Sequence, residues 1–230
     1  MSSSKVEPME KVELTDGIDI KEWQIQLPDS TCLTYSMWDF AGQSVYYNTH
    51  QFFFSQRAIY VLVWNVRLGS EYAGLEFWLS SISCHAPGAP IFVVGTHIDQ
   101  VSKYFLNQKS LKMRFPQIEG FFFVSNSSMK GVSVLAKKLV AVTLQQKYIG
   151  EKIPETWFNF ETAIKAMSKS KALISFSELV QLAEASSLFN EQEILQATRF
   201  LNDLGTVQYF ESTGLKDNIV INPQWIVSGS

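Results

Sequence analysis

The chain has 230 residues, of which 46% are hydrophobic and 18% are charged, which is enough for one sizeable core and a smaller one. A formal net charge of −3 argues against nucleic acid or an anionic membrane as the main partner. The longest apolar run, residues 58–64, is too short to span a bilayer, and the polar start contains no secretion signal. Cys32 and Cys84 lack metal-type spacing, so we expect reduced core thiols in a cytoplasmic protein, with peripheral membrane attachment left open.

The first half of the chain predicts a hairpin followed by alternating strands and helices. Residues 1–14 are polar and expected to be irregular or disordered. The apolar run at 58–64 predicts a strand that is buried on both faces. The order implies an α/β fold with a mainly parallel sheet between helices. The expected elements are strands at 19–27 and 31–38, a partly helical loop at 44–56, a strand at 58–64, a helix at 71–84, a strand at 90–95, a helix at 101–114, a strand at 120–125 and a helix at 132–148.

The pattern changes after the boundary at residues 150–154. Three helices followed by two short strands indicate a winged-helix-like α+β module. Residues 151–230 hold 6 lysines and arginines against 10 acidic residues, a net charge of −4, so a DNA-binding role for this module is disfavoured. The expected elements are helices at 154–167, 175–185 and 190–204 and strands at 206–210 and 219–221.

One strand ends in the residues Trp38-Asp39-Phe40-Ala41-Gly42-Gln43, which suit the magnesium and phosphate end of a nucleotide site. Asp39 can reach a phosphate-bound Mg²⁺, Gly42 can bring its backbone N–H to the terminal phosphate, and Gln43 can orient an attacking water as the catalytic residue. Thr15, just before the first strand, can ligate the same metal as a switch residue. The alternatives are an ordinary turn for residues 39–43 and an exposed loop threonine for Thr15.

Two further strand ends suit the base of a guanine nucleotide. The strand at 90–95 is followed by Thr96, His97 and Asp99, and Asp99 can accept hydrogen bonds from N1–H and the exocyclic amine of guanine. Ser125 and Asn126 follow the next strand in a turn that can contact the base oxygen. Thr96 and His97 stand where the usual guanine pattern has Asn and Lys. Alternatives are an exposed loop histidine for His97 and a helix N-cap for Asp99.

These motifs together resemble the Roc domain of Roco proteins, a family that includes the leucine-rich repeat kinases. Thr-His-x-Asp in place of Asn-Lys-x-Asp is typical of that family. The segments that carry the resemblance to Roc are 15–23, 38–43, 49–53, 56–60 and 94–99, and those that resemble the first part of the adjoining COR domain are 153–154, 200–205 and 221–225.

The resemblance implies a Ras-like GTPase domain over residues 15–150 and an incomplete, N-terminal part of COR over residues 151–230. It further implies GTP or GDP with Mg²⁺ as ligands, and a nucleotide-dependent switch with COR as relay and dimerisation module. Members of the family usually carry leucine-rich repeats before this segment and often a serine/threonine kinase after it. Guanine nucleotide and protein partners, including a homodimer through COR, are therefore the expected partners.

The Roc pattern also requires a phosphate-binding loop, Gly-x-x-x-x-Gly-Lys-Ser/Thr, and these 230 residues contain no such sequence. The strand that feeds this loop, central in Ras-like sheets between the strand that ends at Asp39 and the strand at 58–64, has no counterpart either. We therefore expect a fragment that binds GTP weakly or not at all, so that GTPase activity is an open question. Two sheet edges should be left unpaired, or the strands near residues 35 and 61 should pair directly. The alternative is a pseudo-GTPase fragment that acts only as a protein-interaction module.

Overall fold

The structure is a computed structural model that describes residues 15, 17–42, 47–69, 74–211, 214–215 and 217–228. The chain divides into two compact units: the hairpin unit, Met1–His50 with Gln224–Ser230, and the main unit, Gln51–Pro223. Its short helices are α1 Tyr47–His50, η2 Gln51–Phe53, η3 Val66–Leu68, η4 Ile98–Gln100 and α8 Pro223–Ser228.

The hairpin unit is built on two antiparallel strands, β1 (Ile18–Gln26) and β2 (Cys32–Phe40), paired from Ile18 with Phe40 to Gln26 with Cys32. The turn is closed by the Leu27 N–H, which donates to the Thr31 carbonyl at 2.8 Å. The Asp29 carboxylate accepts from the Thr31 N–H at 3.0 Å, a bond typical of Asp in turns. The predicted pair of strands and its turn are therefore present.

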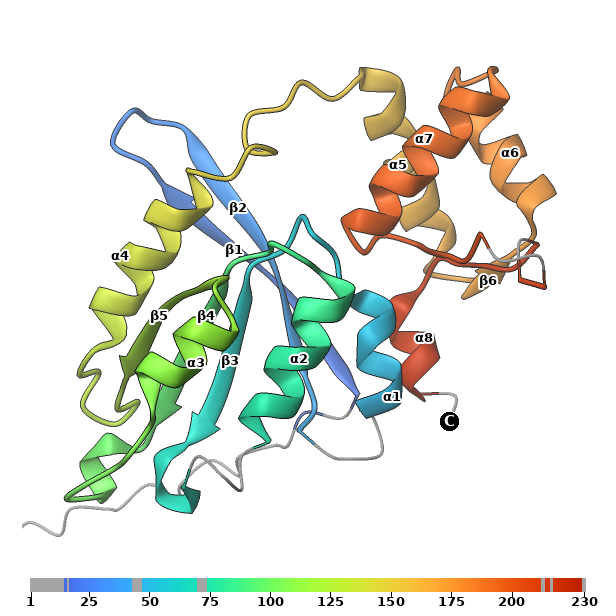
Figure 1. Ribbon diagram of the computed structural model, residues 1–230. Coiled ribbons are helices and arrows are strands. Elements are labelled where there is room, and N and C mark those ends of the chain that lie inside the picture. Colours follow the sequence, from blue (N-terminus) through green and yellow to red (C-terminus); the bar gives the residue numbers. More distant parts are fainter. Residues whose placement is uncertain are drawn as a thin grey trace, which may run out of the picture. The chain divides into compact units, whose positions relative to one another are not determined.

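The main unit begins with a fully parallel sheet in the order β3-β4-β5, which has helices on both faces (Figure 1). The expected α/β fold with a parallel sheet is confirmed. Its elements are β3 Tyr60–Asn65, α2 Leu75–His85, β4 Ile91–Thr96, α3 Gln108–Arg114, β5 Ile118–Phe123 and α4 Val132–Thr143.

The side chains of the central strand β4 alternate between the two faces of the sheet, and this explains why helices cover both faces. Ile91 and Val93 belong to the cluster that contains residues of α2 and α3, whereas Phe92 and Val94 pack with residues of α4. Successive side chains of a strand point to opposite faces, so an unbroken apolar run needs helices on both sides. The sequence 91–94 is wholly apolar for this reason, and all four residues are buried.

The prediction that residues 58–64 are buried on both faces is wrong. Val61 is 43% and Val63 is 58% exposed. In register they align with Phe92 and Val94, so they share the face that α4 covers further along the sheet. Among the described residues β4 is the only strand that pairs with β3, and β1 and β2 form a sheet of their own.

Two smaller predictions also need correction. The helix expected at 101–114 is only α3, because the Asn107 side chain caps it by accepting the Ser110 N–H at 3.1 Å. Cys32 and Cys84 are exposed, not core residues. Cys32 is the first residue of β2 and Cys84 lies at the end of α2, where an apolar side chain is not required.

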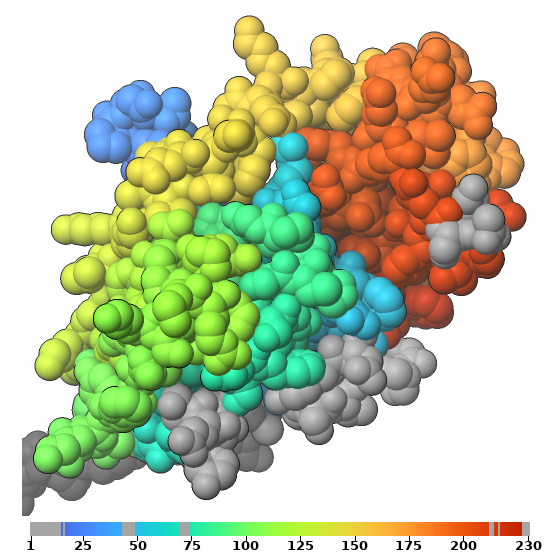
Figure 2. All heavy atoms as spheres, viewed as in Figure 1, coloured from blue at the N-terminus to red at the C-terminus, as the bar shows by residue number. Residues whose placement is uncertain are grey.

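The second part of the main unit is a three-helix module with a small antiparallel sheet in the order β6-β8-β7. In Figure 2 the atoms of α5 to α7 form one contiguous lobe, coloured gold to red. Phe160, Ile164, Leu179 and Leu201 are among its fully buried core residues. The predicted winged-helix-like module is present, with one added strand, β6. Its elements are α5 Glu155–Met167, β6 Leu173–Ile174, α6 Phe176–Ala185, α7 Glu191–Asp203, β7 Gln208–Tyr209 and β8 Ile219–Val220.

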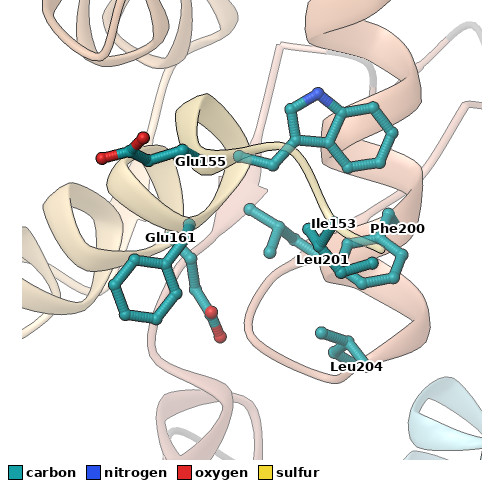
Figure 3. Close-up of a pocket in the computed structure, with 8 residues that line it drawn as sticks. Ile153, Glu155, Glu161, Phe200, Leu201 and Leu204 are labelled. Carbon is teal, nitrogen blue, oxygen red and sulfur yellow. The ribbon is translucent and has the colours of Figure 1, made fainter. Parts of the chain in front are cut away.

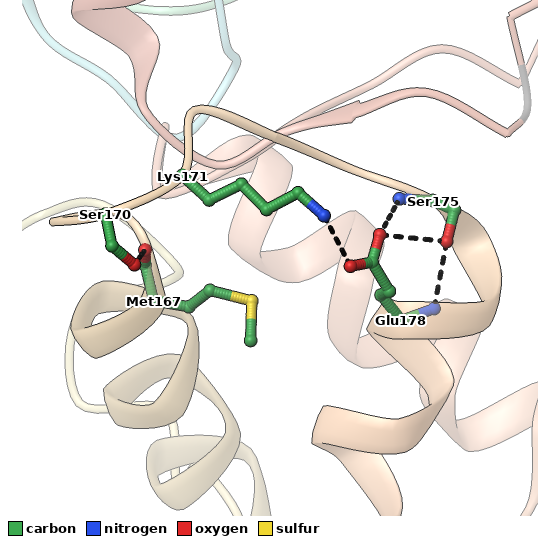
Figure 4. A network of polar contacts seen from close by, with 5 residues as sticks. All are labelled: Met167, Ser170, Lys171, Ser175 and Glu178. Carbon is green, nitrogen blue, oxygen red and sulfur yellow. Dashed lines mark hydrogen bonds and ion pairs between the residues drawn. The ribbon is translucent and has the colours of Figure 1, made fainter.

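Helix α6 begins with a capping box. The Ser175 hydroxyl oxygen accepts the Glu178 N–H at 3.2 Å, and the Glu178 carboxylate accepts the Ser175 N–H at 2.9 Å (Figure 4). Lys171 adds an ion pair to the same carboxylate. The Lys171 ammonium and the two bonds from Ser175 lower the pKa of Glu178 to about 2.

Among the described residues, no helix combines the length and the apolar character needed to cross a membrane.

Candidate functional site

The base-side residues follow two neighbouring parallel strands, β4 and β5, whose carboxyl ends meet at one edge of the sheet. The Val124 N–H donates to the Gly95 carbonyl at 2.8 Å and ties the two strand ends together. Gly95 is required here, because a Cβ would lie 2.8 Å from Val66 Cγ1 and 2.9 Å from the Phe123 ring. This packing brings the turn after β4 against the turn after β5.

Asp99 presents an ionised carboxylate at this edge. The Ser127 hydroxyl donates to Asp99 Oδ2 at 3.0 Å. Hydrogen bonds from the Ser125 side chain, from the backbone of Asp99 itself and from Ser127 lower the pKa of Asp99 below its ordinary value. A hollow of about 190 Å³ is lined by His97, Asp99, Gln100, Asn126 and Ser127. Three of the predicted base-side residues, His97, Asp99 and Asn126, therefore line one small hollow, whereas Thr96 and Ser125 do not line it.

Thr96 and His97 are held by local hydrogen bonds. Thr96 Oγ1 lies 3.2 Å from the Trp64 carbonyl oxygen and 2.9 Å from His97 Nδ1. His97 has a left-handed backbone, with φ of 63°, and its carbonyl accepts the Gln100 N–H at 3.0 Å. Non-glycine residues seldom adopt this conformation, and it is most often found at turns and functional sites.

The metal-side residues lie in the hairpin unit. The Thr15 hydroxyl donates to Asp39 Oδ2 at 3.0 Å, so the two predicted ligands are neighbours. A hydroxyl and a carboxylate are oxygen donors of the kind that Mg²⁺ prefers. Across the described part of the chain, no three residues among His, Cys, Asp and Glu gather into a metal site. The chemistry of these two oxygen donors fits a Mg²⁺ ion.

The two other predicted residues of that unit are Gly42 and Gln43. Gly42 is exposed, and among the described residues nothing lies within 4 Å of the position that a Cβ would take there. The preceding residue is anchored, because the Ala41 N–H donates to the Gly17 carbonyl at 2.9 Å. Gln43 lies outside the described residues, so its catalytic role stays a prediction.

Two residues that line the hollow have contacts that the sequence did not predict. Ser127 orients Asp99, and Gln100 accepts from Arg67 Nη1 at 2.8 Å, which joins η4 to η3. The run Ser125-Asn126-Ser127-Ser128 was a usable signal, since serine hydroxyls at a strand end often bond carboxylates and backbone groups nearby.

A second feature of the main unit joins its sheet to its winged-helix-like module, and we term it the Arg57 junction. Arg57, three residues before β3, forms an ion pair with Glu151. Its guanidinium carbon lies 5.0 Å from the Phe200 ring centre and 5.3 Å from that of Tyr148. The Arg57 side chain is only 22% exposed. Cations over aromatic faces are attracted to them, most strongly when water is excluded.

The junction has a second contact point and a neighbouring acid. Phe52 and Phe210 meet edge to face with ring centres 5.5 Å apart. Burial raises the pKa of Asp203, and the charge of Arg57 opposes that rise. Residues 52–57 thus contact the module at both ends of this segment.

A larger hollow, about 350 Å³, lies in the winged-helix-like module and is mainly apolar. Figure 3 shows Ile153, Leu201 and Leu204 close together, with the Glu155 carboxylate directed away from them. The Glu161 carboxylate accepts from Thr206 at 2.9 Å and pairs with Lys165. The charged side chains that line it are both acidic, so this hollow does not suit the phosphates of a nucleotide.

Two family models match this chain. Residues 3–99 match the family described as "Ras of Complex, Roc, domain of DAPkinase", and residues 154–229 match "C-terminal of Roc, COR-A domain". The chain is 35% identical to a probable serine/threonine-protein kinase, pats1, of Dictyostelium discoideum over 93% of its length. It is 26% identical to the leucine-rich repeat serine/threonine-protein kinase 1 of Mus musculus over 89% of its length. It spans 8% and 12% of those two proteins.

A solved structure shows the same fold. The Roco2 RocCORdC structure of Methanosarcina barkeri, bound to GDP, superimposes with a TM-score of 0.84 and 31% identity. The match covers 94% of this chain and 65% of that one. The two family matches follow each other along the chain as the parallel sheet and the winged-helix-like module do. The chain is therefore a Roc–COR segment of the Roco family.

Proposed function

We propose that this segment is a guanine-nucleotide-dependent switch, with residues 15–150 as the nucleotide-binding part and residues 151–230 as its COR relay. The observation that carries the proposal is Asp99, which serine and backbone hydrogen bonds keep ionised where it lines the hollow at the sheet edge. Its two oxygens can accept both guanine donors, N1–H and the exocyclic amine, whereas adenine offers no such pair. The GDP bound in the related Roco2 structure supports the same ligand class.

The remaining base-side residues have supporting roles in this proposal. Ser125 and Asn126 lie in the turn expected to contact the base oxygen, and His97 lines the hollow beside the base. In the hairpin unit Thr15 and Asp39 would hold Mg²⁺, which supplies positive charge against the phosphates when it is bound. Gln43 is proposed to orient the attacking water in hydrolysis.

Binding by these 230 residues alone should be weak. They contain no Gly-x-x-x-x-Gly-Lys-Ser/Thr sequence, and such a loop contributes most of the contacts to the phosphates. The test is a titration of the purified chain with GDP and ADP at millimolar concentration, followed by ligand-observed NMR. Saturable binding of GDP with a clear preference over ADP supports the proposal, and equal responses to the two nucleotides would contradict it.

We further propose that the Arg57 junction links the nucleotide-binding part to COR. Residues 52–57 follow Asp39 and Gln43 in the chain. Phe52 contacts Phe210, and Arg57 contacts Phe200 and Glu151. A movement of residues 52–57 would therefore be transmitted to α7, because Arg57 already contacts Phe200 of that helix. Dimerisation through COR is proposed by analogy with the family, and sedimentation of the chain at rising concentration tests it.

A second candidate is a pseudo-GTPase segment that only binds proteins. The lack of a phosphate-loop sequence in these residues favours it. It predicts no GDP response at any concentration, together with retained capture of a COR partner. The GDP and ADP titration therefore separates the two candidates.

A further inference from the structure

Thr96 offers one hydroxyl hydrogen to two neighbouring acceptors. Its Oγ1 lies 3.2 Å from the Trp64 carbonyl oxygen and 2.9 Å from His97 Nδ1. A carbonyl oxygen can only accept, and a hydroxyl carries a single hydrogen. If that hydrogen pointed to His97, two bare oxygens would face each other at 3.2 Å. The hydrogen therefore goes to Trp64, and the Thr96 oxygen offers only lone pairs to His97.

This arrangement decides which nitrogen of His97 carries the hydrogen. A lone pair on Thr96 needs a donor opposite it, so Nδ1 of the neutral ring is the N–H. Nε2 is then left with an exposed lone pair, and among the described residues no hydrogen bond to it is present. The left-handed backbone of His97 and the bond from the Gln100 N–H hold the residue in place.

We infer that Thr96 is a positioning residue, which sets the tautomer of His97 so that Nε2 accepts a hydrogen bond from a ribose hydroxyl of the bound nucleotide. The inference rests on the proposed function. Asp99 takes the N–H donors of guanine that mark the base, and the ionised phosphates have none to give. The 2′ and 3′ hydroxyls are the donors that remain for an acceptor in the same hollow.

The first test needs no nucleotide. The chain has three histidines, so long-range ¹H–¹⁵N correlations of the ring can be assigned to His97 by their loss in His97→Gln. We expect the Nδ1–H tautomer in the unmodified chain and in Thr96→Ser, which keeps the hydroxyl. Thr96→Val removes the hydroxyl and should release the ring to the Nε2–H form. An Nε2–H ring in the unmodified chain, or an unchanged tautomer in Thr96→Val, overturns the inference whether or not GDP binds.

The second test uses the nucleotide. The analogue 2′,3′-dideoxy-GDP lacks both hydroxyl donors and should bind about three- to tenfold more weakly than GDP, the usual effect of one lost hydrogen bond. Thr96→Ser should keep this difference, and Thr96→Val should abolish it. Equal affinity of the unmodified chain for GDP and the analogue, with GDP bound, removes the ribose contact while leaving the guanine proposal intact. Thermal melts of both variants show whether they fold.

Discussion

The two parts of the main unit, the parallel sheet and the winged-helix-like module, differ in how completely their side chains are buried. The winged-helix-like module has a core of fully buried residues such as Phe160 and Leu201, and its helices α6 and α7 begin at side-chain caps. The parallel sheet leaves Val61 and Val63 of β3 exposed. The difference indicates that the side chains of the module are more completely buried than those of β3.

The largest loss of stability should come from a substitution in the buried core of the winged-helix-like module. Phe160→Ala removes a fully buried ring and should lower the free energy of unfolding by about 3–5 kcal/mol, through lost burial and a cavity. Val63→Thr, on the exposed face of β3, should change it by less than about 0.5 kcal/mol. Urea unfolding of both variants gives the two values. Similar losses would mean that β3 is as well covered as the module.

The next effect concerns the Arg57 junction between the two parts. Arg57→Ala should cost about 1–2 kcal/mol, because it removes a partly buried cation from two aromatic faces and from Glu151. Arg57→Lys should cost less than Arg57→Ala, because lysine keeps the charge and loses only the planar group. The rate of amide hydrogen exchange in α7 shows whether the lost stability affects this helix.

Arg114→Ala is the matched control for the junction. It breaks the exposed pair with Glu76 on α2 and a contact with the Phe115 ring, and it should destabilise the chain less than Arg57→Ala, without effect on α7. If the two alanine variants speed exchange in α7 equally, the Arg57 junction does not couple the sheet to the module.

A smaller effect is expected at the cap of α6. Ser175→Ala should cost about 1 kcal/mol, the usual contribution of an N-cap side chain. The pKa of Glu178 is lowered from 4.5 to about 2, so its contribution is fully present above pH 4.5 and is lost as the pH falls toward 2. Glu178→Gln should flatten the stability profile between these values. A profile that is unchanged by this substitution would rule out the carboxylate as its source.

The base side of the site could be predicted from the sequence, because residues at the carboxyl ends of parallel strands meet at one edge. Thr96, His97, Asp99, Ser125 and Asn126 follow β4 and β5, and the structure brings His97, Asp99 and Asn126 around one hollow. The partner of Asp99 could not be assigned, since the choice of Ser127 depends on the exact turn.

Other features depend on contacts that a local pattern does not contain. The run 58–64 is apolar enough for a strand buried on both faces, but burial depends on whether a helix covers Val61 and Val63. Arg57 and Glu151 are 94 residues apart in the chain, so nothing near either one predicts their pairing. Strand β6 is two residues long, which is too short for an alternating pattern.

The proposed contact of Asp99 with guanine is tested by the affinity of the chain for GDP, ADP and xanthosine diphosphate before and after Asp99→Asn. Xanthine has a carbonyl where guanine has its amine, so the amide of Asn can donate where the carboxylate accepted. We predict that the substitution weakens GDP binding on the order of 100-fold and creates binding of xanthosine diphosphate. GDP binding that is unchanged in Asp99→Asn would contradict the account.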